Sequence, residues 1–159
     1  LARIYRILSE DIEQVDDGPR LRGSGQHGDP FEIDGLPFVD TRDTRDSTDS
    51  VFDQYIACSD ANESGPEYVY RFTTDRVRRL RALVLDRGDV DIDIHVLDER
   101  GTPEGCINRD HHMVEGTFAP GTYYFVLDSF TNREGTARAG PYLFSLTECE
   151  DDDLDCQDD

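Results

Sequence analysis

The sequence contains no Lys and no Trp, and it has only one Met. All 16 basic residues are therefore Arg, and 36 Asp and Glu residues outnumber them to give a formal net charge of -20. Such a surface repels phosphate backbones and anionic headgroups, so neither nucleic acid nor a membrane surface is an expected partner. Divalent cations are more compatible with this charge.

Long hydrophobic runs are also missing. No segment approaches the roughly 18–20 consecutive apolar residues that a membrane helix needs, so we expect no membrane insertion. A length of 159 residues is typical of one domain with short appendages. The first residue is Leu, and no signal-like apolar core follows it. We therefore expect a processed or excised piece of a longer precursor.

The chain has four cysteines and no C-x-x-C pair, which disfavours a zinc knuckle or a thioredoxin-type redox motif. An even count in an acidic, turn-rich chain instead favours disulfides in an exported protein. We predict that Cys58 pairs with Cys106 and that Cys149 pairs with Cys156. Reduced, buried cysteines in a cytosolic protein are the alternative.

Three regions are expected along the chain. Residues 1–35 comprise an amphipathic helix, predicted from apolar residues at helical spacing between Leu1 and Val15, followed by a turn-rich linker. Residues 36–149 form the folded domain. Residues 150–159 are an acidic tail, in which like charges repel each other.

The central region consists of short runs rich in β-branched and aromatic residues, broken by Gly, Pro, Asn and Asp, which is typical of an all-β domain. Parallel strands would need crossover helices, and no helix-length pattern lies between these runs. We therefore predict an antiparallel two-sheet β-sandwich, jelly-roll-like in its connections. The expected strands are Phe38–Thr41, Val51–Ala57, Tyr68–Thr73, Leu80–Leu85, Val90–Leu97, Gly116–Phe118, Thr122–Asp128 and Tyr142–Thr147.

The clearest strand signal is the strict alternation of acids and aliphatics at residues 89–97. In a strand, Val90, Ile92, Ile94 and Val96 would share one face, which we expect to be buried. Asp89, Asp91, Asp93 and His95 would share the other, which we expect to face water.

Four segments, in order, resemble the bacterial pre-peptidase C-terminal domain: Gly65–Phe72, Asp89–Leu97, Pro120–Ser129 and Gly140–Leu146. The resemblance implies a compact β-sandwich near the C-terminus of a secreted bacterial hydrolase, with a non-catalytic role in targeting, solubility or substrate attachment. The related collagen-binding modules of clostridial collagenases bind calcium through an acidic, Asn-rich segment that precedes the sandwich. This chain has no matching pattern there, so those ligands are not transferred to it.

Calcium prefers six to eight oxygen ligands, which an acidic chain can supply at several places. The first candidate is the loop Ser59–Glu67, in which Asp60, Asn62, Glu63 and Glu67 offer oxygens. The second consists of Asp89, Asp91 and Asp93, completed by Asp128. The competing interpretation of both sets is a solvated acidic face, and it is slightly favoured over either single site.

No catalytic residues are predicted. The chain lacks a G-x-S-x-G elbow and an H-E-x-x-H motif, and nothing singles out a pair of carboxylates for glycoside hydrolysis. His27, His95 and the adjacent pair His111 and His112 are expected to be ordinary surface histidines rather than zinc ligands. Aromatic residues near strand ends could form a sugar-stacking platform: Tyr123, Tyr124, Phe130 and Tyr142. Tyr123 and Tyr124 are adjacent on one strand, so they must face opposite ways.

Three functions follow, in order of preference. The first is a non-catalytic accessory domain of a secreted or cell-surface bacterial exoenzyme, stabilised by calcium if any cofactor is present. Its partners would be an upstream catalytic domain or an extracellular protein or polysaccharide. A free-standing carbohydrate- or protein-binding module is the second, and a small secreted hydrolase is the third.

Overall fold

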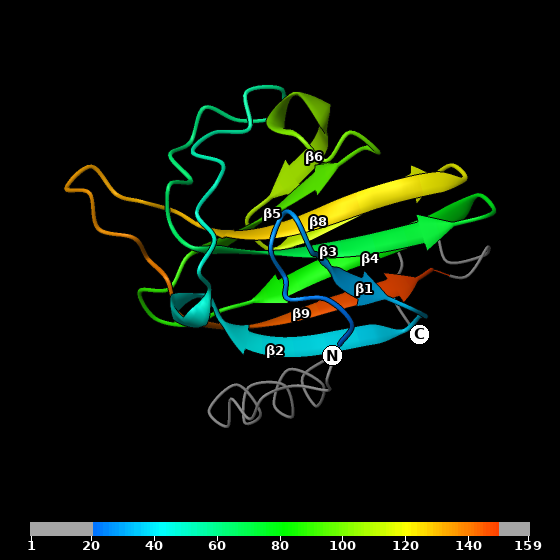
Figure 1. The fold of residues 1–159 in the computed structure, drawn as a ribbon, viewed down its shortest axis with the longest axis horizontal. Coiled ribbons are helices and arrows are strands. Elements are labelled where there is room, and N and C mark those ends of the chain that lie inside the picture. The colour runs from blue at the N-terminus through cyan, green and yellow to red at the C-terminus, as the bar shows by residue number, and fades with distance from the viewer. Residues whose placement is uncertain (1–20, 150–159) are drawn as a thin grey trace.

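Two β-sheets pack face to face in the computed structural model, which describes residues 21–149 (Figure 1). The strands are β1 (Phe31–Ile33), β2 (Phe38–Asp43), β3 (Glu67–Thr74), β4 (Arg78–Leu85), β5 (Ile92–Leu97), β6 (Cys106–Asp110), β7 (Met113–Phe118), β8 (Gly121–Ser129) and β9 (Pro141–Glu148). Within residues 21–149 the helical elements are two short 3-10 turns, η1 (Thr44–Asp46) and η2 (Pro103–Gly105). The prediction of an all-β sandwich is confirmed.

One sheet has the strand order β1-β3-β8-β5-β6, and the other has the order β2-β9-β4-β7. The prediction that all strands run antiparallel is wrong at one pair, because β1 lies parallel to β3. All of β1 comes from residues 31–33, which we expected to be linker. The described part of the sandwich therefore begins before residue 36.

The main core lies between the two sheets. Ile92, Ile94 and Val96 of β5 are fully buried there, as the alternation predicted. They pack in one cluster with aromatic residues such as Phe125 and Phe144. Removing this much apolar surface from water is the dominant favourable contribution to folding.

The predicted strand Val51–Ala57 is wrong, because residues 51–57 form an irregular loop. Its apolar residues do not alternate: Val51 and Ile56 are exposed, whereas Tyr55 is fully buried. Strand β6 was missed, because Cys106–Asp110 carries mostly polar side chains. It nevertheless pairs with β5 as an edge strand.

The long connection from β2 to β3 forms an additional layer outside the two sheets. We call residues 49–66 of this connection the cover segment. It passes over the face of the five-stranded sheet that points away from the other sheet (Figure 1). Its Tyr55 packs onto the sheet in a small apolar cluster with Val69, Leu97, Cys106 and Val126. The part of this sheet that lies under the cover segment is therefore buried on both faces.

The cover segment is anchored at several points. A disulfide joins its Cys58 to Cys106 of β6, which confirms that predicted pairing. Gly65 donates a backbone hydrogen bond to the Ser129 carbonyl, and a Cβ atom at Gly65 would lie 2.3 Å from that oxygen. Only glycine permits this close approach.

Cys149 is not a free thiol, and its predicted partner Cys156 lies outside the described residues.

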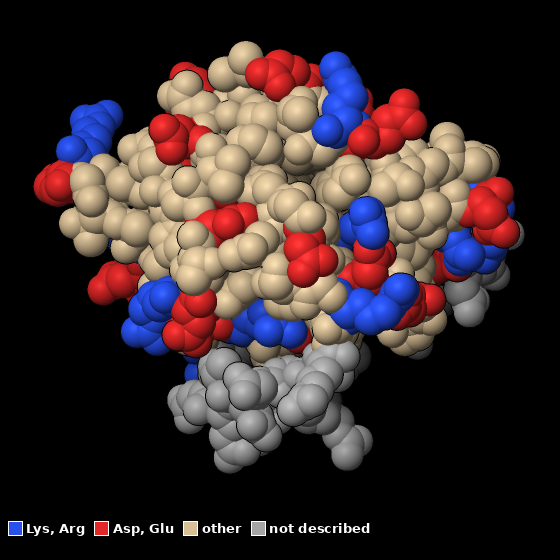
Figure 2. Space-filling view, viewed as in Figure 1, with Lys and Arg blue, Asp and Glu red and all other residues tan. Residues whose placement is uncertain are grey.

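Arginine and acidic side chains are interspersed over the face of the molecule seen in Figure 2. Several form ion pairs: Arg76 and Arg78 contact Glu148, and Arg81 contacts Glu115. Within the described residues no helix is long and apolar enough to cross a membrane. The predicted helix at the N-terminus and the acidic tail at residues 150–159 lie outside the described residues.

Candidate functional site

Three acidic side chains form a row across the outer face of the five-stranded sheet. Glu67 of β3 is the register partner of Asp128 of β8, and Asp128 is the partner of Asp93 of β5. All three are fully buried beneath the cover segment. The prediction that Asp93 and His95 face water is therefore wrong, although Asp89 is exposed as predicted, because alternation identifies two faces but not what covers each of them.

The cover segment adds two further side chains to this row. Glu63 is fully buried and approaches Asp93 and His95 from above the sheet. The Tyr55 ring stacks on the His95 imidazole with 3.7 Å between centroids and 12° between planes, and its hydroxyl donates to Asp128 Oδ2 at 2.8 Å. His95 is thus enclosed, and its assignment as a surface histidine was wrong.

Glu67 and Asp128 form a buried carboxyl pair. Glu67 Oε1 accepts hydrogen bonds from the Val51 backbone N–H at 2.6 Å and from His27 Nε2 at 2.8 Å. Burial, reinforced by the nearby Glu67 charge, raises the pKa of Asp128 well above its usual range. A proton on Asp128 would satisfy the two oxygens of the pair that otherwise have no partner, Asp128 Oδ1 and Glu67 Oε2.

The second group consists of Glu63, Asp93 and His95. Burial, reinforced by the nearby Asp93 carboxylate, raises the pKa of Glu63 to about 9. Burial also lowers the pKa of His95 to about 3, so its imidazole is neutral in ordinary buffers. Neither oxygen of Glu63 and neither ring nitrogen of His95 has a hydrogen-bond partner.

Asp93 is better satisfied than its neighbours. Arg109 of β6 donates to Asp93 Oδ2, and the same guanidinium lies 3.7 Å from Glu63 Oε1. His111 Nδ1 lies 2.6 Å from Asp93 Oδ1, and its side chain is 57% exposed. Arg109 and His111 therefore stand between the buried group and solvent.

The residues proposed as calcium ligands are spread over the molecule. Asp60 and Asn62 are exposed, whereas Glu63 of the same loop is buried. Asp89 and Asp91 lie before β5 begins, and the Asp89 side chain is fully exposed. The structure instead brings Glu63 and Asp93 together, one from each predicted set, and adds His95, which was in neither. Calcium binding stays a prediction.

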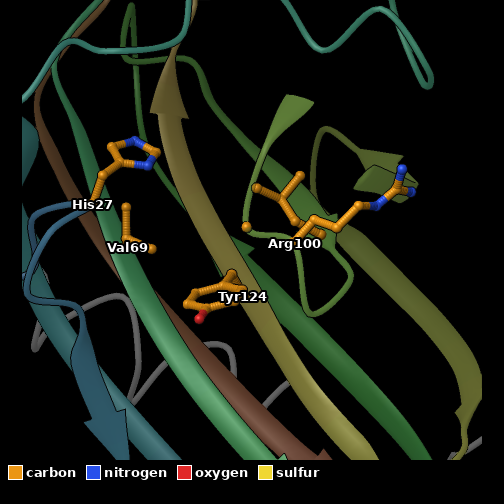
Figure 3. A pocket seen from close by; sticks show the side chains of 6 residues that line it. His27, Val69, Arg100 and Tyr124 are labelled. Atoms are coloured by element: carbon orange, nitrogen blue, oxygen red, sulfur yellow. The ribbon is translucent and has the colours of Figure 1, made fainter. Parts of the chain in front are cut away.

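A shallow cavity of about 100 Å³ lies near this site, lined by His27, Val69, Leu97, Arg100, Gly101 and Tyr124. Figure 3 shows Tyr124 on β8 beside Val69 of β3, with the Arg100 guanidinium pointing away from the tyrosine ring. As predicted, the adjacent tyrosines face opposite ways: Tyr123 packs on the main core and Tyr124 on the outer cluster. Tyr142 is fully buried and cannot stack on a ligand.

The arrangement limits what chemistry is possible. Among the described residues, three groupings of His, Asp and Glu have ligand atoms within 4.8 Å of one another: Glu63, Asp93 and His95; Asp91, Asp93 and His111; and His27, Asp49 and Glu67. The three side chains of the first are fully buried, so a large substrate cannot reach them in this fold. Such a group can hold an ion or a proton, but it is poorly placed to act on a polymer.

Neither protein-family models nor curated proteins match this chain. Among solved structures, the pre-peptidase C-terminal domain of collagenase from Bacillus anthracis is 16% identical, over 73% of this chain and 92% of that domain, with a TM-score of 0.47. The Aeromonas hydrophila periplasmic inhibitor of g-type lysozyme is 10% identical, over 74% of this chain and 93% of the inhibitor, with a TM-score of 0.47.

A third similar structure is a cycloisomaltooligosaccharide glucanotransferase from a Paenibacillus species. It is 13% identical with a TM-score of 0.33, and the match covers 72% of this chain but only 17% of that enzyme. All three TM-scores lie below 0.5, so the description of the fold rests on the strand pairings of this chain.

Proposed function

We propose that this chain is a non-catalytic accessory domain of a secreted bacterial enzyme, which stabilises that enzyme or attaches it to its substrate. The observation that supports this most directly is the closure of the outer face by the cover segment. The groups best suited to acid-base chemistry, Glu63, Asp93, Asp128 and His95, are all fully buried there. A substrate cannot reach them without unfolding of that layer.

The disulfide supports placement outside the cytoplasm. Cys58 and Cys106 lie 48 residues apart and are joined across two layers of the fold. Disulfides of this structural kind persist in oxidising compartments and are rare in the cytosol. A secreted or cell-surface location follows, with an upstream catalytic domain or an extracellular protein or polysaccharide as the partner.

An immunoblot of cells and culture medium from the source organism tests the accessory role. We expect an antibody raised against residues 21–149 to detect a polypeptide larger than the 18.1 kDa chain, with both forms in the medium or at the cell surface. Detection of this antigen only inside the cytoplasm would contradict the proposal.

The purified full chain provides the second test. Incubated with protein and polysaccharide substrates, it should release no product above buffer. Product release that disappears in both Glu63→Gln and His95→Gln, but persists in the exposed control Glu134→Gln, would establish the small hydrolase instead. These three variants separate a real activity from contamination.

A free-standing binding module is the second candidate, because Tyr124 lines a cavity on the surface. Sedimentation with insoluble collagen and cell-wall polysaccharide would measure this binding. If the cavity is the binding site, Tyr124→Ala should abolish saturable binding, whereas Tyr123→Phe, on the opposite face, should retain it. Equal binding by the two variants would exclude the cavity as the binding site.

A further inference from the structure

We propose that Glu63, Asp93 and His95 form a site for one divalent transition-metal ion, and that Zn²⁺ is the ion that best matches these donors. The site lies between β5 and the cover segment. It does not depend on the accessory role, since a metal bound there would stabilise the fold whatever the domain does.

The geometry of the three side chains fits a single ion. Asp93 and His95 are two residues apart on β5, so they share its outer face, and Glu63 reaches them from the cover segment. Their ligand atoms lie within 4.8 Å of one another, and His95 Nε2 is 3.9 Å from Glu63 Oε1. At tetrahedral angles, zinc bonds to nitrogen and oxygen of about 2.0–2.2 Å place two donors about 3.4 Å apart, so these side chains would move together by about 1 Å to hold one ion.

The second observation is that two of the three donors, Glu63 and His95, have no hydrogen-bond partner. Both oxygens of Glu63 and both ring nitrogens of His95 are fully buried without a hydrogen bond. A neutral imidazole carries one N–H and one lone pair, so either tautomer leaves a donor and an acceptor unsatisfied here. Buried polar groups are nearly always satisfied, and an ion between Glu63 and His95 would satisfy a carboxylate oxygen and a ring nitrogen together.

The local charge favours a cation. Four buried carboxyl groups, those of Glu63, Glu67, Asp93 and Asp128, lie on one face of the sheet. Arg109 is the cation that contacts Asp93 and approaches Glu63. A divalent ion would let Glu63 remain ionised without leaving a net negative charge at a buried position. Each Asp93 oxygen has a second lone pair, so it can bind the ion while keeping Arg109 and His111.

The donor set distinguishes zinc from calcium. Calcium takes six to eight oxygen ligands, often including waters, in an open site. Here one donor is an imidazole nitrogen, and Tyr55 packed flat on the ring restricts the space around it. Imidazole with carboxylates suits zinc and its neighbours in the first transition series. His111 and Arg109 at the rim mark the side from which an ion would enter.

Equilibrium dialysis of the chelator-treated full chain, followed by elemental analysis, tests the proposal. We expect one equivalent of Zn²⁺ per chain, no comparable uptake of Ca²⁺, and a higher melting temperature with Zn²⁺. Glu63→Gln and His95→Gln should each bind Zn²⁺ more than about tenfold more weakly. Mutating a residue that only hydrogen-bonds a metal ligand already lowers metal affinity roughly 10–100-fold, and these two variants remove a ligand itself. His112→Ala, exposed and outside the group, is the matched control and should bind normally.

Because His95 is buried, its variant could fail to fold, and circular dichroism would show this. Nitrogen NMR of the histidine rings in the unmodified protein avoids that difficulty. Of the four histidines, His95 should show the largest shift when Zn²⁺ is added. Three results would each overturn the proposal. Zinc would shift only the ring signals of His111 and His112, all variants would retain zinc equally, or the protein would take up no zinc. Calcium binding in place of zinc would overturn it as well.

Discussion

On the inner face of β5, Ile92, Ile94 and Val96 pack against apolar side chains of the second sheet, whereas on its outer face Asp93 and His95 lie under a loop. Both sets are fully buried. The inner face needs only close packing, while the outer face needs partners for its polar groups as well. Burial on one side is driven by the hydrophobic effect, and on the other it depends on the anchors of the cover segment.

Removing the disulfide is expected to have the largest effect on the difference between the two faces. Cys58→Ser with Cys106→Ser opens a loop of 48 residues and should lower the free energy of unfolding by about 4 kcal/mol. Urea denaturation measures this. Hydrogen exchange should then speed up beneath the cover segment, at Val69 and Val126, more than in the main core at Phe144. Equal acceleration at both places would contradict a separate outer layer.

Truncating the inner face is the next test. Ile94→Ala removes buried methyl groups from the main core and should cost about 3 kcal/mol, because the cavity it leaves collapses only in part. Val39→Ala, at a half-exposed position on β2, is the control and should change stability by less than about 0.5 kcal/mol. Urea midpoints that shift equally in the two variants would show that β5 is not central to the core.

The polar face predicts a dependence of stability on pH that the apolar face does not. The folded pKa of Glu63 is about 9, well above its unfolded value, so its stabilising contribution is present at low pH. It should be lost as the pH rises between about 4.5 and about 9. In metal-free buffer, Glu63→Gln should flatten this decline, and Glu134→Gln should not. Urea unfolding at a series of pH values measures it.

His95 acts in the opposite direction. Its folded pKa of about 3 lies below the unfolded value, so stability should fall as the pH drops from about 6.5 towards 3. The same titration of His95→Gln should lose that acid decline. A decline of unchanged size would show that other groups cause it.

The smallest expected effect is at Tyr55. Tyr55→Phe keeps the ring stacked on His95 but removes the hydroxyl that donates to Asp128, and this should cost about 1 kcal/mol. Thermal unfolding with a matched Tyr124→Phe variant, on the same face but at the cavity, measures the difference. A loss at Tyr124 as large as that at Tyr55 would mean that the bond to Asp128 contributes nothing specific.

The sequence predicted the inner face better than the outer one. Alternation placed Ile92, Ile94 and Val96 correctly because strand periodicity is local, and two sheets follow from many short strands without helices. The burial of Asp93 and His95 depends on a loop whose path no local pattern specifies. Glu63 meets His95 across 32 positions of chain, and only the tertiary fold brings them together.

The errors at strand level have the same origin. Residues 51–57 carry strand-forming side chains, but Tyr55 packs from this loop onto the sheet and the segment pairs with no neighbouring strand. Strand β6 has little strand propensity of its own and is held by β5 and by its disulfide. Tertiary contacts override weak local preferences in both cases.

The attachment of Cys106 also bears on how long the protein would survive among digestive enzymes. A protease must draw several residues of extended backbone into its cleft, and an edge strand such as β6 is an obvious place to begin. Because β6 is covalently fastened to the overlying layer, peeling it away would require that layer to detach with it. The disulfide thereby protects an edge strand from proteolysis, which backbone pairing on one side only would not do.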